Sequence, residues 1–178
     1  MSLWVYSSSV EADARLTAWW LQLHASGDLA RAWHPSAHAL HGFLGTLQPP
    51  NVTLWDADAE GVAFVAWFEP TMDGAAMGAW VRPALRTTRR GLAYFLEAWD
   101  WALARWPVIL GYTKQEALIR QHTRVGYAVC GCVPALWGGE PVWVLALTRA
   151  RFAAARARFE RPGQLDLPLE ALQALVTA

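Results

Sequence analysis

The segment from residue 81 to residue 91 holds three arginines and a glycine where a helical pattern begins. The arginines are Arg86, Arg89 and Arg90, and the glycine is Gly91. A helix start leaves backbone amides unpaired and carries a partial positive charge, so it attracts an anion such as a diphosphate. Guanidinium groups add charged donors, and a glycine lets the backbone approach the oxygens closely. We therefore expect a diphosphate cradle here, with a solvated basic helix start as the alternative.

A second group of residues that could do chemistry consists of the histidines His34, His38 and His41. In a helix this spacing would place them on one side, as metal ligands often are. Pro35 disfavours a helix through His34, because the residue before a proline avoids helical geometry. No cysteine or carboxylate joins the three histidines, so we expect no metal site.

Tryptophan is unusually abundant, with 12 in 178 residues. Most of them fall in predicted strands or on apolar helix faces, where large aromatic side chains form ordinary core. Three lie near the segments that could carry chemistry and could line an aromatic pocket: Trp67, Trp80 and Trp137. Packing in the core is the alternative for all three.

Length and composition indicate one folded domain. The chain has 178 residues, 54% hydrophobic and 17% charged, which excludes a disordered chain and allows a sizeable core. No apolar run approaches the roughly 20 residues that span a bilayer, and the first residues lack a signal-peptide pattern, so we expect a cytoplasmic protein without a membrane partner. Basic and acidic residues balance at 15 each, which predicts no nucleic-acid partner. Without a secretion signal, Cys130 and Cys132 should be reduced thiols.

Hydrophobic periodicity predicts a short strand, two helices, an antiparallel meander of three strands, a helix, a buried strand, a helix and a closing strand pair. The predicted strands cover residues 3–6, 52–55, 62–68, 76–81, 108–112, 127–133 and 142–147. Capping boxes at residues 8–11 and 113–116 predict two helix starts. Residues 56–61 are expected to form the first turn of the meander.

This order of elements resembles the fold of the GNAT superfamily of N-acetyltransferases over residues 2–148. The expected fold is α/β (α+β), with a mixed, mostly antiparallel sheet of about seven strands flanked by helices. Members end the fourth strand with a valine, a proline and the pattern R/Q-x-x-G-x-G/A. Four residues match in order and spacing: Val81, Pro83, Arg86 and Gly91. Arg89 stands where the first glycine is expected. Residues 1–148 would form the acyltransferase domain, and residues 149–178 a helical extension packed on it.

The resemblance implies that acetyl-CoA is the co-substrate and that no metal takes part. A backbone amide of the strand at residues 77–81 would polarise the thioester carbonyl. Gln115 stands where members often have an asparagine. The residues implied to bind acetyl-CoA are Val81, Arg86, Thr87, Thr88, Arg89, Arg90, Gly91 and Gln115.

A further similarity lies in residues 122–127, where members show Y-x-[KR]-x-G-[FY]. Arg124, Gly126 and Tyr127 fit this pattern. The first tyrosine of the pattern often serves as general acid toward the CoA thiolate, and His122 stands in its place. An imidazolium can protonate a thiolate, since its ordinary pKa is about 6.5 against about 8.5 for a thiol. The alternative is a partly buried histidine that packs or forms hydrogen bonds.

The resemblance also implies a general base that deprotonates the acceptor amine and a set of residues that contact this amine. Glu69, after the second meander strand, is the first candidate for the base, and Asp73 is the second. The alternative for Glu69 is a charged surface residue without a catalytic role. The residues expected to contact the acceptor are His34, Trp67, Trp80 and Trp137. The acceptor itself would be an unidentified small-molecule or peptide amine.

The implied activity is therefore acyl-CoA-dependent N-acyl transfer, most simply N-acetyl transfer. The alternative is a catalytically degenerate GNAT-like module for binding or assembly, as occurs among phage-encoded proteins. The departures from the family pattern point to this alternative, and they are Arg89, Gln115 and His122. The arginine-rich C-terminal helices could form a solvated basic surface, or they could dock an acidic partner or a second copy of the chain as a homodimer.

Overall fold

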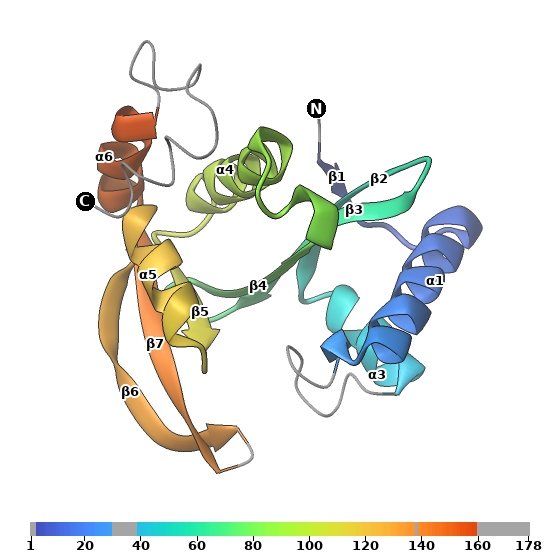
Figure 1. Ribbon diagram of the computed structural model, residues 1–178, viewed down its shortest axis with the longest axis horizontal. Helices are drawn as coiled ribbons and strands as arrows, with labels where there is room; N and C mark the ends of the chain where they lie inside the picture. The colour runs from blue at the N-terminus through green and yellow to red at the C-terminus, as the bar shows by residue number, and fades with distance from the viewer. Residues whose placement is uncertain (1–2, 30–38, 138, 160–178) are drawn as a thin grey trace. The chain divides into compact units, whose positions relative to one another are not determined.

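The computed structural model describes residues 3–29, 39–137 and 139–159. Seven strands form a sheet with the hydrogen-bonded order β1-β2-β3-β4-β5-β7-β6 (Figure 1). The chain divides into two compact units, and strand β4 and helix α4 contribute residues to both. Unit 1 comprises Met1–Pro70 and Gly78–Trp99, and unit 2 comprises Thr71–Met77 and Asp100–Ala178. The strand count and the order of elements confirm the prediction from periodicity.

The strands of unit 1 include the three-strand meander expected from the sequence, with β1 beside it. They are β1 (Trp4–Val5), β2 (Val52–Asp58), β3 (Gly61–Pro70) and the end of β4 (Ala75–Val81). β2 pairs antiparallel with both β1 and β3. The expectation of a turn at residues 56–61 is wrong for its first half, because β2 continues through Asp56 and Asp58. Arginines from outside this hairpin pair with these two carboxylates and keep them in the strand.

Two helices pack against the sheet of unit 1: α1 (Val10–Ser26) and α3 (Leu40–Leu47). The Ser9 hydroxyl caps α1 by accepting a hydrogen bond from the Ala12 amide at 3.2 Å, so the predicted box at residues 8–11 is one residue out of register. The apolar stripe of α1 is buried at Leu16, Trp19 and Leu23 and partly buried at Trp20. The core cluster that it joins contains Leu16, Trp19, Leu23, Leu29, Phe43, Leu47, Val62 and Val65.

Unit 2 is built on three strands beside the start of β4. They are β5 (Val108–Thr113), β6 (Ala128–Trp137) and β7 (Glu140–Thr148). β5 runs parallel to β4 and antiparallel to β7, and β6 and β7 form a long hairpin (Figure 1). Helix α5 (Glu116–Arg124) has Gln115 as its N-cap residue, and the Gln115 amide donates to the Thr113 hydroxyl at 3.0 Å. Thr113 remains the last residue of β5, so the capping box predicted there is wrong although the helix is present.

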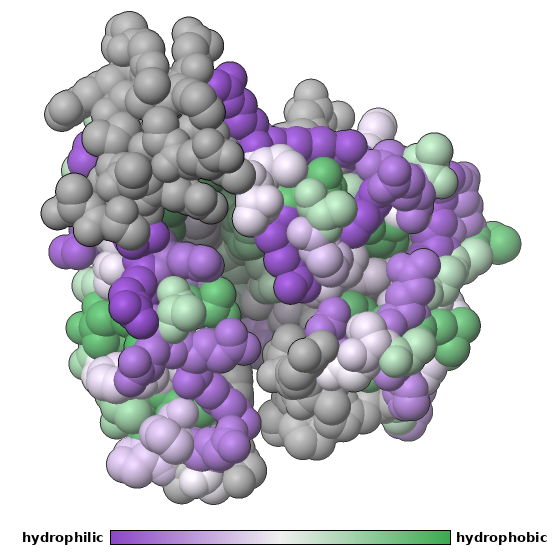
Figure 2. Space-filling model, viewed as in Figure 1, coloured by the Kyte–Doolittle hydropathy of each residue, from purple (hydrophilic) through white to green (hydrophobic). Residues whose placement is uncertain are grey.

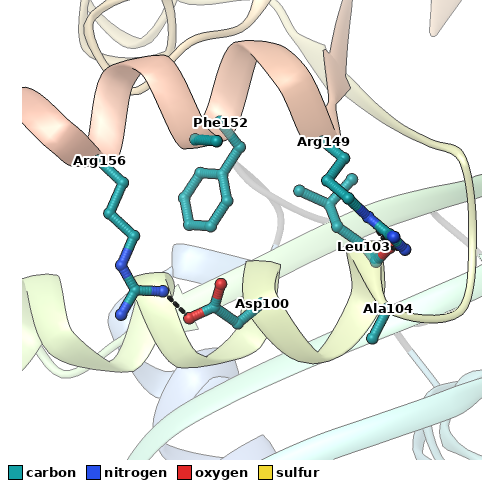
Figure 3. Close-up of a pocket in the computed structure, with 7 residues that line it drawn as sticks. Asp100, Leu103, Ala104, Arg149, Phe152 and Arg156 are labelled. Atoms are coloured by element: carbon teal, nitrogen blue, oxygen red, sulfur yellow. Dashed lines mark hydrogen bonds and ion pairs between the residues drawn. The ribbon is translucent and has the colours of Figure 1, made fainter.

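The last described helix, α6 (Arg149–Phe159), packs against the end of α4 (Arg89–Leu103). Phe152 is buried there, and a groove of about 310 Å³ lies between the two helices (Figure 3). An ion pair between Arg156 and Asp100 crosses one end of the groove, and at the other end Arg149 donates to the Leu103 carbonyl. The predicted helix beyond residue 162 lies outside the described residues, and the domain boundary at residue 148 stays a prediction.

The described surface shows no large apolar area on the face seen in Figure 2, where hydrophilic and hydrophobic residues are interspersed. The exposed large hydrophobic side chains are spread along the sequence: Trp4, Val5, Val10, Leu21, Met72, Val129 and Val133. Among the described residues, no helix combines the length and the hydropathy required to cross a bilayer.

Candidate active site

The segment between β4 and α4 is a short 3-10 turn that leads into a capped helix. β4 ends at the buried Val81, and the 3-10 helix η2 covers Pro83–Leu85. The Thr88 hydroxyl accepts a hydrogen bond from the Gly91 amide at 3.1 Å and donates one to the Leu85 carbonyl at 2.9 Å. Thr88 therefore caps α4 and satisfies one of its first amides within the protein.

Gly91 has a role inside the fold as well as the one predicted toward a ligand. A Cβ at this position would lie 2.0 Å from the Leu85 carbonyl oxygen and 3.0 Å from the carbonyl carbon. Both are backbone atoms, so no side-chain rotation could relieve the overlap. The absence of a side chain at Gly91 therefore lets the 3-10 turn pack directly on the first turn of α4.

Arg86 and Arg89 are exposed beside this helix start, together with Thr87. The Arg86 Nε donates to the Val81 carbonyl at 3.3 Å, which anchors that side chain at the end of β4. Within the described part of the chain, no protein group accepts a hydrogen bond from the terminal nitrogens of Arg86. Two cationic side chains and the positive end of a helix thus share one exposed place, an arrangement that suits a diphosphate.

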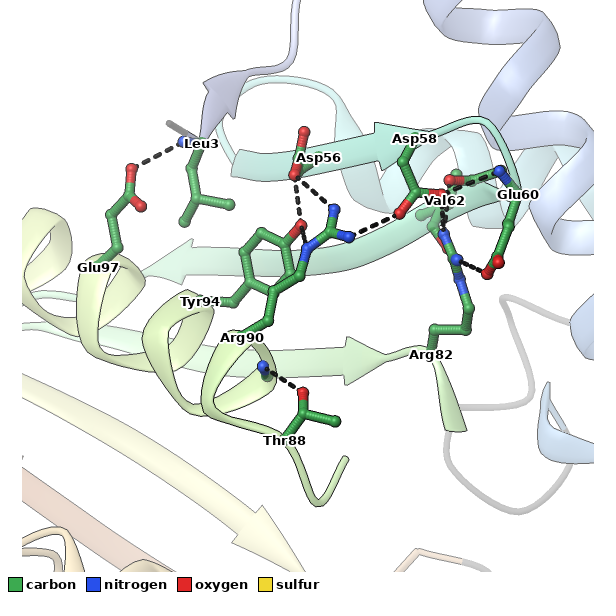
Figure 4. Close-up of polar contacts among 12 residues, drawn as sticks. Leu3, Asp56, Asp58, Glu60, Val62, Arg82, Thr88, Arg90, Tyr94 and Glu97 are labelled. Atoms are coloured by element: carbon green, nitrogen blue, oxygen red, sulfur yellow. Dashed lines mark hydrogen bonds and ion pairs between the residues drawn. The ribbon is translucent and has the colours of Figure 1, made fainter. Parts of the chain in front are cut away.

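Arg90 lies among the carboxylates of β2 and the Tyr94 hydroxyl (Figure 4). Its Nη1 lies 3.0 Å from Asp58 and its Nη2 lies 3.7 Å from Asp56 on β2. Its Nε donates to the Tyr94 hydroxyl at 3.0 Å. The charge of Arg90 is therefore compensated within the protein, and its part in holding a diphosphate stays a prediction.

Asp58 also pairs with Arg82, which the motif comparison did not single out. The Asp58 Oδ1 accepts from the Arg82 Nη2 at 2.6 Å, and Arg82 also binds Glu60 at 2.5 Å. Arg82 donates further to the carbonyls of Gly61 at 2.9 Å and Val62 at 3.2 Å. The hydrogen bond from Arg82 holds the pKa of Asp58 below its ordinary value. Arg82 therefore ties the end of β4 to the β2–β3 hairpin through an ionised carboxylate.

Tyr94 completes this polar cluster from the second turn of α4. Its hydroxyl donates to Asp56, and its ring stacks on Phe64 with centroids 5.1 Å apart. Burial, together with the hydrogen bond to Asp56, raises the pKa of Tyr94 to about 12. The sequence did contain a signal for the cluster, since acidic residues at every second position put Asp56 and Asp58 on one face of a strand.

Trp67 and Trp80 pack against the core of unit 1. The indole of Trp67 lies directly on the backbone of β4, where a Cβ on Gly78 would be 1.9 Å from the ring. The Trp80 ring lies 5.3 Å from that of Trp19, centroid to centroid. Among the described residues, the buried Nε1 of Trp80 has no hydrogen-bond partner. These contacts support the packing alternative for both tryptophans, and a contact with an acceptor stays a prediction.

His122 lies on α5, and its ring contacts the backbone of the same helix. Its Nδ1 is 2.6 Å from the carbonyl oxygen of Leu118. A carbonyl can only accept, so Nδ1 carries the proton of the neutral ring and Nε2 keeps its lone pair. Burial lowers the pKa of His122, which makes the imidazole neutral near pH 7. The ring meets Tyr127 edge-on, with centroids 5.0 Å apart.

The remaining predicted residues lie at separate places. Gln115 is exposed at the start of α5, and Glu69 and Asp73 are exposed at and just beyond the end of β3. Trp137 is the last residue of β6, but its side chain is not among those described, and His34 lies outside the described residues. Unit 1 thus brings the cradle residues together, whereas the α5 residues belong to unit 2.

Other surface features involve none of the predicted site residues. Besides the groove in Figure 3, a groove of about 360 Å³ lies in unit 1 beside Trp4 and Trp55. Cys130 and Cys132 are free, exposed thiols on β6. In the described ranges, no three histidine, cysteine or acidic side chains are grouped as a metal site requires.

Solved structures of N-acetyltransferases match most of the chain. The spermidine N-acetyltransferase SpeG from Vibrio cholerae, in complex with CoA and spermine, has a TM-score of 0.63 and 9% identity over 85% of this chain and 98% of that one. The ribosomal-protein-alanine N-acetyltransferase from Brucella melitensis has a TM-score of 0.63 and 15% identity over 82% and 99% of the two chains. The ribosomal-protein-S18-alanine N-acetyltransferase from Escherichia coli has a TM-score of 0.57 and 16% identity over 83% of this chain and 94% of that one. No protein-family model and no curated protein matches the sequence.

These matches show that the chain has the GNAT fold, as predicted from the order of its elements. The sheet has seven strands and is mostly antiparallel, with β4 and β5 as a parallel pair. At identities of 9–16% the likeness concerns the backbone, so the chemistry has to be argued from this chain's own residues.

Proposed function

We propose that the protein is an acyl-CoA-dependent N-acyltransferase, which transfers acetyl from acetyl-CoA to a small-molecule or peptide amine. The GNAT fold supports this proposal. The observation that carries it is the exposed start of α4, where Arg86 and Arg89 stand beside a helix capped by Thr88. The diphosphate of CoA is the group that such a place can hold by charge. The residues present therefore fit the donor.

The proposed reaction needs one proton to move. Acetyl-CoA supplies a thioester, and an uncharged amine attacks its carbonyl carbon. A C–N bond forms, the C–S bond breaks, and the proton lost by the amine ends on the departing thiolate. The protein must therefore provide a group that accepts a proton and then releases it.

His122 is the proposed carrier of this proton. Because its ring is neutral near pH 7 with a lone pair on Nε2, it can accept a proton before it can donate one. The predicted role as an acid toward the thiolate then becomes the second half of a cycle in which His122 first takes the amine proton. Glu69, exposed at the end of β3, is the other candidate for the base.

The first experiment is calorimetric titration of the purified protein with acetyl-CoA. We expect saturable binding, and we expect the double variant Arg86→Ala/Arg89→Ala to bind at least about tenfold more weakly because two charged donors are lost. Arg15→Ala is the matched control, since Arg15 is also partly exposed and pairs with Glu11 on α1. No heat of binding at millimolar acetyl-CoA would overturn the proposal.

Turnover separates the enzyme from a degenerate binding module. Release of free CoA thiol can be followed with a panel of amines. The panel should include spermidine and peptides with an N-terminal alanine, since proteins with this fold act on such groups. Thiol release above the rate without amine supports the enzyme. Binding of acetyl-CoA without any amine-dependent thiol release supports the module.

A further inference from the structure

A single carboxylate binds both ends of the segment that leads into α4 (Figure 4). The Asp58 Oδ1 lies 2.6 Å from Nη2 of Arg82, and its Oδ2 lies 3.0 Å from Nη1 of Arg90. Arg82 directly follows β4, and Arg90 is the second residue of α4. The 3-10 turn and the helix cap lie between these two arginines in the sequence. Asp58 therefore closes this segment into a loop with a fixed span.

Both arginines that bind Asp58 make further contacts within the protein. Arg82 is anchored by Glu60 and by the Gly61 carbonyl, and its side chain is only 14% exposed. Arg90 is anchored by the Tyr94 hydroxyl. Asp58 itself belongs to β2, so its two ion pairs attach the loop to the sheet of unit 1.

At this helix start Arg90 differs from Arg86 in the partners of its terminal nitrogens. Arg86 and Arg89 are exposed and stand beside the helix start. To reach a ligand, Arg90 would have to leave Asp58 and Asp56 and expose two carboxylates whose charges it compensates. All three arginines are exposed, so the ion pairs of Arg90, and not its burial, favour ligand binding by Arg86 over ligand binding by Arg90.

We infer that Asp58 and Arg90 are a positioning pair for the acyl donor, and this inference rests on the proposed function. They hold the η2 turn and the first turn of α4 so that Arg86, Arg89 and the helix-start amides present a preformed site to a diphosphate. Neither residue of the pair contacts the donor. Preorganisation of this kind strengthens binding because the ligand does not have to order the loop.

The test is a double-mutant cycle in acetyl-CoA affinity. Asp58→Asn removes the negative charge and replaces one of the two acceptor oxygens with an amino group that cannot accept, so we expect about tenfold weaker binding, and a similar loss in Arg90→Ala. The double variant should bind acetyl-CoA no more weakly than the single variant with the lower affinity, because each substitution removes the same ion pair between Asp58 and Arg90. A rise in affinity in Asp58→Asn would mean that Arg90 is a ligand released from a competing carboxylate, and it would overturn the inference. Unchanged affinity in both single variants would overturn it as well.

Hydrogen exchange without ligand keeps this inference separate from the proposed function. In both single variants we expect the amides of residues 84–92 to exchange faster, while those of α1 and β5 keep their wild-type rates. Unchanged exchange in residues 84–92 would overturn the inference even if binding fell. If the wild type binds no acetyl-CoA, the proposed function fails, and the exchange data still decide whether Asp58 orders the segment.

Two controls exclude a general loss of structure. Asp100→Asn removes another aspartate–arginine pair, that with Arg156, and should leave acetyl-CoA affinity unchanged. Arg90→Lys keeps the charge but loses the planar set of N–H donors that contacts two carboxylates and Tyr94. Its affinity for acetyl-CoA should therefore lie between those of the wild type and Arg90→Ala. In any variant that turns over, the KM for acetyl-CoA should rise while the KM for the amine stays constant.

Discussion

The Nδ1 of His122 lies 2.6 Å from the carbonyl oxygen of Leu118, four residues earlier on the same helix. This contact fixes the tautomer, and burial lowers the pKa of the ring. We therefore expect an NMR titration of the His122 ring protons to give a pKa below 6.5, with Nδ1 protonated in the neutral form. A pKa at or above 6.5 would contradict the neutral ring on which the proposed proton transfer depends.

The lowered pKa of His122 also predicts how stability depends on pH. The unfolded chain binds a proton at this residue near pH 6.5, whereas the folded chain binds it only at lower pH. The contribution of the neutral ring is therefore complete above about pH 6.5 and is lost as the pH falls through the folded pKa. In urea unfolding, the stability difference between the wild type and His122→Gln should shrink between pH 7.5 and pH 5. A difference that is independent of pH would argue against a depressed pKa.

Gly91→Ala should destabilise the protein, because its Cβ would overlap the Leu85 carbonyl at 2.0 Å. We expect a loss of about 2 kcal/mol or more in the free energy of unfolding, since the helix start or the 3-10 turn must move. Gly45→Ala is the matched control on α3, where nothing lies within 4 Å of the added Cβ. There alanine should stabilise the helix by about 0.5–1 kcal/mol. Equal effects of the two substitutions would refute the close packing at Gly91.

The parts of the fold that were predictable are those set by local patterns. The stripe with Leu16, Trp19 and Leu23 repeats at helical spacing, and these side chains are buried as that spacing requires. The order of elements along the chain and the GNAT fold followed from a succession of such patterns. The helix start at Thr88 was also within reach, because a hydroxyl before a helical pattern is a local signal.

The parts that were missed depend on partners far away in the sequence. Aspartate is a common turn residue, so Asp56 and Asp58 were assigned to a turn by local preference. They remain in β2 because Arg82 and Arg90, more than twenty residues later, neutralise them. The same ion pairs distinguish Arg90 from the other residues of the predicted cradle, because Arg90 is bound by Asp56 and Asp58 within the protein. The alternation of Asp56 and Asp58 places both carboxylates on one face of a strand, but no periodicity identifies the arginines that pair with them.

Tyr94 offers a test of the polar cluster at alkaline pH. Its hydroxyl donates to Asp56, so Tyr94→Phe should cost about 1–2 kcal/mol in the free energy of unfolding at pH 8. The pKa of Tyr94 is raised to about 12, while an unfolded tyrosine ionises near pH 10. The stabilisation is therefore complete below about pH 10 and is lost as the pH rises through about 12. Denaturation of the two proteins at pH 8 and pH 10.5 should show the difference shrinking, and a constant difference would place Tyr94 outside the cluster.

Trp67 and Gly78 should be energetically coupled across β3 and β4. A Cβ on Gly78 would lie 1.9 Å from the indole of Trp67, so Gly78→Ala should cost about 1–3 kcal/mol through overpacking. Trp67→Leu alone should cost about 2–4 kcal/mol, because it leaves a cavity against the core. In the double variant the smaller side chain makes room for the new methyl group. The combined loss should therefore be smaller than the sum of the two by about 1 kcal/mol or more. Gly111→Ala on β5 is the control, since the nearest atom to its Cβ is a ring carbon of Tyr127 at 3.4 Å and little change is expected. Strict additivity of the two losses would mean that Trp67 does not rest on the backbone of β4, and the packing assigned to it would have to be abandoned in favour of an open pocket.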